Sequence, residues 1–213
     1  KNVKEYKLQE LRKKIAIVLQ RAELYSRPIE ANIRWGKDDA TPWEIKTAAE
    51  IAQADDFICA SQYGYNTLVT EGGHSLSGGQ KQRISLARAL AVKPAILILD
   101  DTTSAVDMET EKKIQHSLNE LDFSCTKIII AQRISSVSDC DKIIILEEGG
   151  INDIGTHEEL LSRNEIYKIN GFEKRLSKLL ELGFVNEIYC FDRVFILFCR
   201  HKSADAVAHK YLV

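Results

Sequence analysis

The chain has 213 residues, with 29 Lys and Arg against 31 Asp and Glu and a formal net charge of −2. Hydrophobic residues make up 45% of it, which together with the small net charge excludes an intrinsically disordered chain. The balanced charge also argues against a strongly basic nucleic-acid-binding protein, so no nucleic-acid partner is expected. The longest uncharged apolar segment, 194–199, is far shorter than the ~20 residues that cross a bilayer.

The cysteines and the first residues indicate the cellular environment of the chain. An odd number of scattered cysteines without a Cys-x-x-Cys pair predicts neither a zinc site nor a disulfide scaffold and favours a reducing, cytosolic environment. The segment 1–7 is charged throughout, unlike a signal peptide, and it does not begin with Met. We therefore expect residues to be missing in front of Lys1. The five cysteines are Cys59, Cys125, Cys140, Cys190 and Cys199.

Apolar patterns in the first half predict one strand and three helices. The run at 15–19 is typical of a strand that ends at Gln20. A capping box at Thr41-Pro-Trp-Glu44 predicts a helix through Gln53, followed by a short helix at 55–61 and a polar loop. A longer amphipathic helix begins near Gly79 and stops before Pro94.

The second half alternates buried strands with helices. The unbroken apolar run at 95–99 is typical of a strand buried on both faces of a parallel sheet. An amphipathic helix at 107–121, a strand at 128–131, a hairpin at 143–154 and a helix opened by a capping box at 156–159 follow. This order predicts an α/β fold with a largely parallel sheet and helices on both faces.

Composition changes near Gly171, where a tail of different character begins. Five of the seven Phe lie beyond this point. The spacing of apolar residues predicts a helix at 172–180 and a strand at 194–198. Such a tail is either a frameshifted or read-through end, which we favour, or a docking segment with an amphipathic helix. We expect two regions, 1–170 and 171–213.

The segment Leu76-Ser-Gly-Gly-Gln80 at the start of the long helix is the sharpest chemical signal. Ser before a helix is most simply an N-cap. Two glycines at the positive end of the helix dipole also expose N–H groups that favour a phosphate. The strand that follows ends in Asp100 and Asp101, at the edge where parallel sheets bind ligands and where carboxylates hold Mg²⁺.

Together these segments resemble the nucleotide-binding domain of ATP-binding cassette (ABC) transporters, of the exporter type. The segment 76–80 is similar to the family signature, 96–100 to the Walker B strand, 104–107 to the D-loop and Gln20 to the Q-loop glutamine. The resemblance covers 1–169 and implies a P-loop NTPase-like fold with a helical signature subdomain at about 21–92.

In that family two cassettes close head to tail around two ATP molecules. The resemblance therefore implies ATP and Mg²⁺ as cofactors, and a second cassette and an exporter's transmembrane domain as partners, at the cytoplasmic face of the plasma membrane. The segment 24–26 would contact the transmembrane domain. Metal-binding roles fall on Gln20 and Asp100, and nucleotide contacts on Ser77, Gly78, Gly79, Gln80 and Asp107.

Two residues depart from the family pattern at one composite site. Asp101 stands where the family has a catalytic Glu, and its carboxylate is about an ångström short for a base that must lie within ~3 Å of its proton. Gln132 stands where the family has the switch His and cannot carry a proton. We interpret this as the degenerate-site subunit of a heterodimeric exporter; the alternative is harmless drift.

The phosphate-binding P-loop, G-x-x-x-x-G-K-S/T, does not occur in these residues. Its only Gly-Lys pair, Gly36-Lys37, has the wrong surroundings. Without the backbone cradle and Lys for the β- and γ-phosphates, we expect the chain alone to bind ATP poorly and not to hydrolyse it. We also expect first strands of the sheet to be missing and sheet edges to be exposed.

Two rival functions come from other classes. A truncated cassette could act as an interaction module that docks through its signature without nucleotide chemistry. A DNA-repair or chromosome-maintenance ATPase shares a similar signature but would carry long heptad arms, which are not found here. Trp35 and Trp43 are interpreted as packing residues. The transported substrate has no sequence signal.

Overall fold

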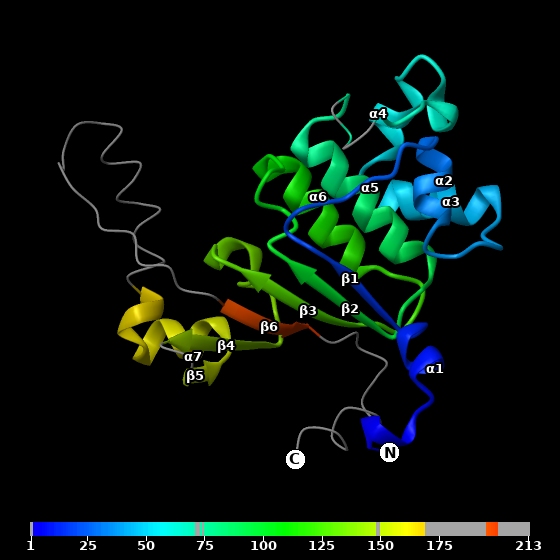
Figure 1. Cartoon of the computed structure of the whole chain (residues 1–213). Helices are drawn as coiled ribbons and strands as arrows, with labels where there is room; N and C mark the ends of the chain where they lie inside the picture. The colour runs from blue at the N-terminus through cyan, green and yellow to red at the C-terminus, as the bar shows by residue number, and fades with distance from the viewer. Residues whose placement is uncertain (1, 71–72, 74, 148–149, 169–194, 200–213) are drawn as a thin grey trace, which may run out of the picture. The chain divides into compact units, whose positions relative to one another are not determined.

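The structure is a computed structural model, and it describes residues 2–70, 73, 75–147, 150–168 and 195–199 (Figure 1). The chain divides into two compact units. The first consists of the described residues up to Lys127, and the second of those from Ile128 on.

Two parallel strands lie at the base of the first unit. Strand β1, Ile15–Val18, pairs in parallel with β2, Ile96–Asp100, in the register Ile15 to Ile96 through Val18 to Leu99. Apolar side chains of both strands alternate between buried and more exposed positions, as the two-residue period of a strand requires. Because the strands are parallel, their carboxyl ends meet at one edge, which brings the residues after 18 near those after 100.

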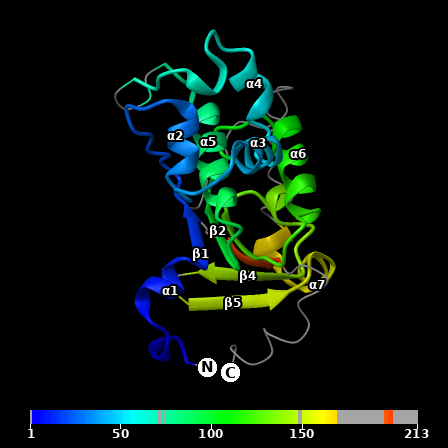
Figure 2. The same cartoon turned by 90° about the vertical axis from the view of Figure 1, so that its right-hand side faces the viewer.

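The helices of the first unit gather around α5, Gly78–Ala91. Figures 1 and 2 show α5 beside α2 and α3, and α5 also contacts β1. Ile84, Leu86, Ala87 and Leu90 on this helix are buried, which confirms its predicted apolar face. The other helices are α1 (Leu8–Arg12), α2 (Ile29–Arg34), α3 (Pro42–Ile51), α4 (Asp55–Cys59), α6 (Met108–Asn119) and the short 3₁₀ helices η1 (Val3–Glu5) and η2 (Gly64–Asn66).

The predicted helices of the first unit are confirmed within a few residues, with two differences. Helix α2 was not predicted, because its six residues carry one turn and a half and no periodic pattern long enough to recognise. The interpretation of Trp43 as a packing residue is wrong, since 67% of it is exposed. Trp35 is 49% exposed and contacts the ring of Tyr25.

The second unit is built on antiparallel pairs. Strand β4, Lys142–Glu147, pairs with β5, Gly150–Gly155, which confirms the predicted hairpin. Strand β6, Phe195–Cys199, lies between β3 and β4 and is antiparallel to β4, with Ile144 opposite Ile196. The strand predicted in the tail is thus confirmed, whereas the helix predicted at 172–180 lies outside the described residues. The remaining elements are β3 (Thr126–Ala131), which begins in the first unit, η4 (Ile134–Ser136) and α7 (His157–Arg163).

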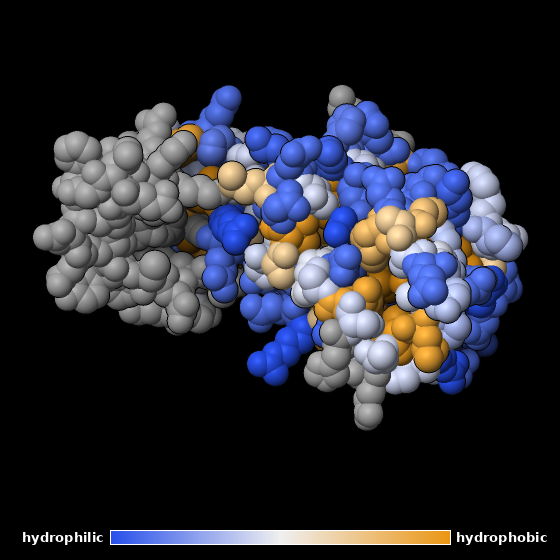
Figure 3. Space-filling view, turned by 90° about the horizontal axis from the view of Figure 1, so that it is seen from above, coloured by the Kyte–Doolittle hydropathy of each residue, from blue (hydrophilic) through white to orange (hydrophobic). Residues whose placement is uncertain are grey.

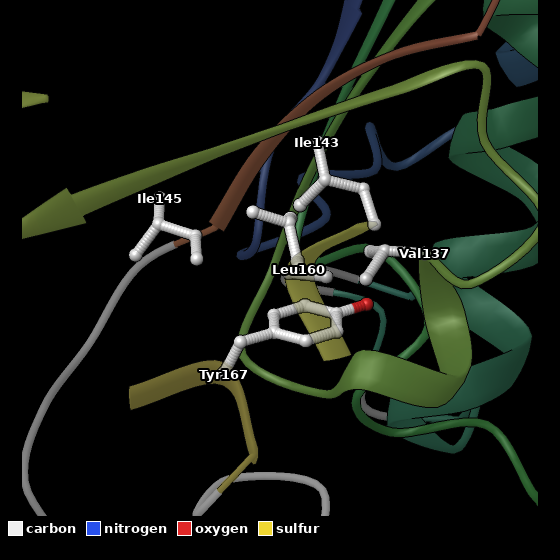
Figure 4. Packing of buried hydrophobic residues seen from close by; sticks show 6 residues of the cluster. Val137, Ile143, Ile145, Leu160 and Tyr167 are labelled. Carbon is white, nitrogen blue, oxygen red and sulfur yellow. The ribbon is translucent and has the colours of Figure 1, made fainter. Parts of the chain in front are cut away.

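A separate apolar cluster forms the core of the second unit (Figure 4). Ile143 and Ile145 from β4 meet Leu160 from α7 and the ring of Tyr167, all of them fully buried. The hydroxyl of Tyr167 lies 2.8 Å from Nδ1 of His157, and burial raises the pKa of Tyr167 to about 12. This cluster holds α7 on the hairpin, and the predicted capping box of Thr156 and Glu159 satisfies the first-turn amides of the helix itself.

Figure 3 shows hydrophobic residues exposed among hydrophilic ones on the face seen from above. No helix in the described parts of the chain is both long and apolar enough to cross a bilayer.

The cysteines differ in their bonding. Cys59 and Cys125 are free thiols, but Cys140 is disulfide-bonded. The bond at Cys140 does not fit the expectation of a chain that contains thiols only.

Candidate functional site

The signature segment forms the first turn of α5. Ser77 is the N-cap: its hydroxyl accepts a hydrogen bond from the backbone N–H of Gln80 at 3.2 Å. In return the side-chain oxygen of Gln80 accepts from the backbone N–H of Ser77 at 2.9 Å. The N-cap interpretation is therefore correct, and it leaves the first-turn amides of Gly78 and Gly79 pointing out of the helix without intrahelical acceptors. No acidic side chain lies in this turn.

Gly79 is required by a close approach of the chain. A Cβ at this position would lie 2.7 Å from the carbonyl oxygen of Ala105. At Gly78 it would lie 3.5 Å from the Cβ of Ala105, an ordinary contact. The start of α5 and the segment 104–107 are thus in direct contact, and two of the predicted motifs meet within this unit.

The ends of β1 and β2 bring Gln20 to the paired acids. The side-chain Nε2 of Gln20 donates to Oδ2 of Asp101 at 3.1 Å, although 81 positions separate the two residues. Asp100, the last residue of β2 and the residue before Asp101, is half-buried. Carboxylate and amide oxygens are the ligands that Mg²⁺ takes, usually one or two carboxylates together with phosphate oxygens. These residues therefore fit a Mg²⁺ that a bound nucleotide would share. Among the described residues, no cluster of three His, Cys, Asp or Glu could hold a metal unaided.

The backbone at Asp101 turns sharply. Its φ is +46°, in the left-handed region that side chains other than Gly rarely adopt. The hydroxyl of Ser104 donates to the carbonyl of Asp101 at 2.9 Å, which stabilises this turn. The hydroxyl of Thr103 donates to the buried carboxylate of Glu111 at 2.9 Å and ties the same loop to α6. The predicted general base is thus held in a strained, well-bonded loop.

Two further predicted site residues belong to other elements. Asp107 caps α6, where its carboxylate accepts from the backbone N–H of Thr110 at 2.9 Å, and this hydrogen bond lowers its pKa. Gln132 is exposed directly after β3, in the second unit. Of the nine predicted residues, the structure joins Gln20 to Asp101 and Ser77 to Gln80 by hydrogen bonds.

A buried polar network, not foreseen from the sequence, fixes the loop that follows Gln20. Asn32 is fully buried in α2 and binds the backbone of Tyr25 through both amide atoms, at 2.9 and 3.0 Å. The guanidinium of Arg88 on α5 donates to the carbonyl of Asn32 at 2.8 Å and to that of Glu23 at 3.0 Å. The sequence signal for this network was an Asn between apolar residues. It could not be recognised because helix α2 was not predicted.

A further contact reaches Gln20 itself. The side chain of Gln82 on α5 donates to the backbone carbonyl of Gln20 at 3.2 Å.

A groove of about 710 Å³ is formed by β1, α5 and the segment 36–39. None of the predicted site residues lines that groove. The predicted site residues of this unit are therefore at the strand ends and at the start of α5 and α6, outside that groove.

Comparison with known proteins agrees with this arrangement. A family profile described as "ABC transporter" matches residues 1–104. An uncharacterized ABC transporter ATP-binding protein, YknU of Bacillus subtilis (strain 168), is 47% identical over 168 residues, covering 79% of this chain and 29% of the relative. The ATP-dependent lipid A-core flippase of Aliivibrio fischeri (strain ATCC 700601 / ES114) is 42% identical over 166 residues, covering 78% and 28%. The structure of a bacterial Atm1-family ABC exporter with ATP bound is similar with a TM-score of 0.77 and 36% identity, covering 81% and 30%.

The chain is thus similar to ABC transporter ATP-binding proteins over about four fifths of its own length. Its fold is the α/β, P-loop NTPase-like fold of an ABC cassette, as the sequence predicted. The chain spans less than a third of the length of the relatives it matches. Activities of those whole proteins are therefore carried to this chain only as proposals.

Proposed function

We propose that this chain is part of the ATP-binding cassette of an ABC exporter and couples ATP binding and hydrolysis to transport across a membrane. The observation that carries the proposal is the hydrogen bond between Gln20 and Asp101, 3.1 Å long, which joins the ends of two parallel strands. Such an edge is where parallel sheets bind their ligands. Relatives named as a flippase and as an exporter support the transport part of the proposal.

The start of α5 serves a nucleotide held by a second cassette. Amides of Gly78 and Gly79, with the hydroxyl of Ser77, offer donors at the positive end of a 14-residue helix dipole. Such donors stabilise the charge of a γ-phosphate without moving, because the capping box between Ser77 and Gln80 already fixes the turn. The phosphates themselves would be cradled by the partner.

The acids at the end of β2 serve the chain's own nucleotide. Gln20 and Asp100 hold the Mg²⁺, whose chemistry is to neutralise charge on the phosphate oxygens. Asp101 is the general base, shorter than the Glu expected from the family resemblance, and Gln132 donates a hydrogen bond in place of a charged His. This site is the slow, degenerate one of a heterodimer, and the site completed by Ser77 is the active one.

The second partner is a transmembrane domain, which places the chain at the cytoplasmic face of the membrane. Tyr25 and Trp35 are both about half exposed, and their rings lie 4.6 Å apart. The guanidinium of Arg27 lies 5.1 Å from the ring of Trp35. Since Asn32 and Arg88 anchor the backbone beneath Tyr25, this surface is rigid enough to transmit a displacement.

Nucleotide titration of the isolated chain is the first test. These 213 residues contain no P-loop segment, so Mg-ATP should bind with a Kd above about 1 mM, measured by calorimetry. Micromolar affinity of the isolated chain contradicts the proposal for the nucleotide contacts. Docking on a second cassette that nucleotide leaves unchanged supports the rival interaction module instead.

Site-resolved turnover in an exporter heterodimer that carries these residues is the second test. Replacing Asp101→Glu and Gln132→His together should raise hydrolysis at the chain's own site. Ser77→Arg should abolish hydrolysis at the partner's site, while hydrolysis at the chain's own site stays measurable. Equal effects of both changes on both sites contradict the assignment of a degenerate site.

A further inference from the structure

Gln82 stands out because its buried side chain is only half satisfied. It lies on α5 two positions after Gln80, and it is 5% exposed. Its Nε2 donates to the carbonyl oxygen of Gln20 at 3.2 Å. Its Oε1 is buried and accepts no hydrogen bond from the part of the chain that the structure describes.

The orientation of this amide is fixed by its partner. The carbonyl of Gln20 can only accept, so the nitrogen of Gln82 must face it, and the oxygen has no donor among the described residues. A buried polar atom without a partner destabilises the folded state. An apolar side chain of similar volume, such as Met, would fill the same space without that penalty. The amide of Gln82 therefore opposes stability, which is typical of residues that serve a site.

The contact joins two parts of the proposed machinery. The first turn of α5 holds Ser77, Gly78 and Gly79, and Gln82 lies in the next turn of the same rigid helix. Gln20, whose backbone Gln82 holds, donates through its side chain to Asp101 at 3.1 Å. A displacement of the helix start thus reaches the Asp101 carboxylate through two hydrogen bonds.

We infer that Gln82 is a positioning residue that couples the start of α5 to Gln20 and, through Gln20, to Asp101. The identity of the two ends as parts of two different ATP sites rests on the proposed function; the mechanical coupling does not. In an exporter, Gln82 makes the geometry at the chain's own site depend on whether the partner's nucleotide has engaged Ser77 and the glycines.

The first experiment uses the full chain labelled with ¹⁵N and compares wild type with Gln82→Met. Side-chain amide signals of Gln20 should move to positions typical of a glutamine whose amide is not held by a fixed hydrogen bond. The urea midpoint should stay the same or rise, because the unpartnered oxygen has been removed. Gln9→Met, an exposed glutamine on α1, is the matched control and should change neither quantity.

Two results overturn the inference at this stage. Unchanged Gln20 signals in Gln82→Met show that the contact does not position Gln20. A lower urea midpoint shows that Gln82 is a structural tether whose loss weakens the fold.

The second experiment tests coupling by a double-mutant cycle. Ser77→Ala loosens the start of α5 and should shift the Gln20 side-chain signals when Gln82 is present but not in the Gln82→Met background. Gly79→Ala, which forces the same turn away from Ala105, repeats the test with a larger displacement if that variant folds. Equal shifts in both backgrounds overturn the coupling. Neither measurement uses nucleotide, so its outcome and that of the ATP titrations are independent.

Discussion

Helices α3 and α5 begin with the same hydrogen-bond pattern but differ in the charge of their first turn. At α3, Thr41 and Glu44 form the capping box, and Lys37 binds the Glu44 carboxylate at 2.6 Å. This ion pair, with the hydrogen bonds from Thr41, lowers the pKa of Glu44 to about 2. At α5, Ser77 and Gln80 form the box, and the turn has no acidic residue.

The difference teaches what distinguishes a binding helix start from a structural one. The positive end of α3 is already neutralised by its own carboxylate, and α7, which has two Glu in its first turn, follows the same rule. Only the start of α5, among these three capping boxes, combines two glycines with a neutral amide. An anion for that turn has to come from outside the helix. The signal in the motif is therefore the absence of an acid rather than the cap.

The largest expected effect is a difference in stability between a substitution at the second residue of α5 and one at the second residue of α3. Gly79→Ala places a Cβ 2.7 Å from the Ala105 carbonyl and should destabilise the chain by about 1–3 kcal/mol in urea unfolding. Trp43→Ala, at the matching position of α3, removes an exposed side chain and should change stability by less than about 0.5 kcal/mol. Similar losses for both variants would show that the close approach at Gly79 has no energetic weight.

Removing the caps should affect the two helices alike. Ser77→Ala and Thr41→Ala should each lower the free energy of unfolding by about 1 kcal/mol, because each hydroxyl accepts a first-turn N–H. Urea unfolding of the two variants side by side measures this. If Ser77→Ala left the free energy of unfolding unchanged, the glycine turn would be held by its contact with Ala105 alone.

Giving α5 the charge of α3 should stabilise it and close it to anions. Gln80→Glu keeps the capping box and adds a carboxylate at the positive end, which should raise stability by about 0.3–1 kcal/mol at low salt. Amide signals of Gly78 and Gly79 should then respond less to added phosphate than in wild type. An equal response in both proteins contradicts the role assigned to the missing acid.

The smallest effect is a pH dependence carried by α3 alone. The pKa of Glu44 is about 2 when folded against an ordinary 4.5, so its stabilising contribution is present above about 4.5 and lost as pH falls towards 2. Glu44→Gln should remove that part of the acid destabilisation, measured as the urea midpoint between these pH values. Other acids with lowered pKa, such as Asp107 and Asp153, remain in both proteins and cancel in the difference. A variant whose midpoint falls as steeply as that of wild type would refute the ion pair's contribution.

Local signals in the sequence predicted much of this fold. Capping boxes at Thr41 and Thr156 and the apolar run at 95–99 each depend on neighbours a few residues away. Both caps and the strand are confirmed, but the expected burial on both faces is not, because Ile96 and Ile98 are only half-buried. The tail strand was predicted from its apolar run, and it is found at 195–199.

Contacts between distant residues could not be predicted in this way. Gln20 was assigned to a metal together with Asp100, but its hydrogen bond goes to Asp101, and the register of two strands decides which acid it meets. Asn32 and Arg88 lie 56 positions apart, so no local pattern could connect them. No local pattern marks Gln82 as buried, because its burial depends on packing against residues far away in the sequence.

The position of β6 has a consequence for the order of synthesis and folding. β4 is followed within a few residues by β5, so that hairpin can form as soon as both have left the ribosome. The strand between β3 and β4 comes only from 195–199, near the end of the 213 residues, so it has to enter between two strands made much earlier. Pairing between strands so far apart in sequence is slow, because the entropy of closing the loop is lost before the stabilising contacts form. The sheet of the second unit is therefore complete only after 195–199 has been synthesised.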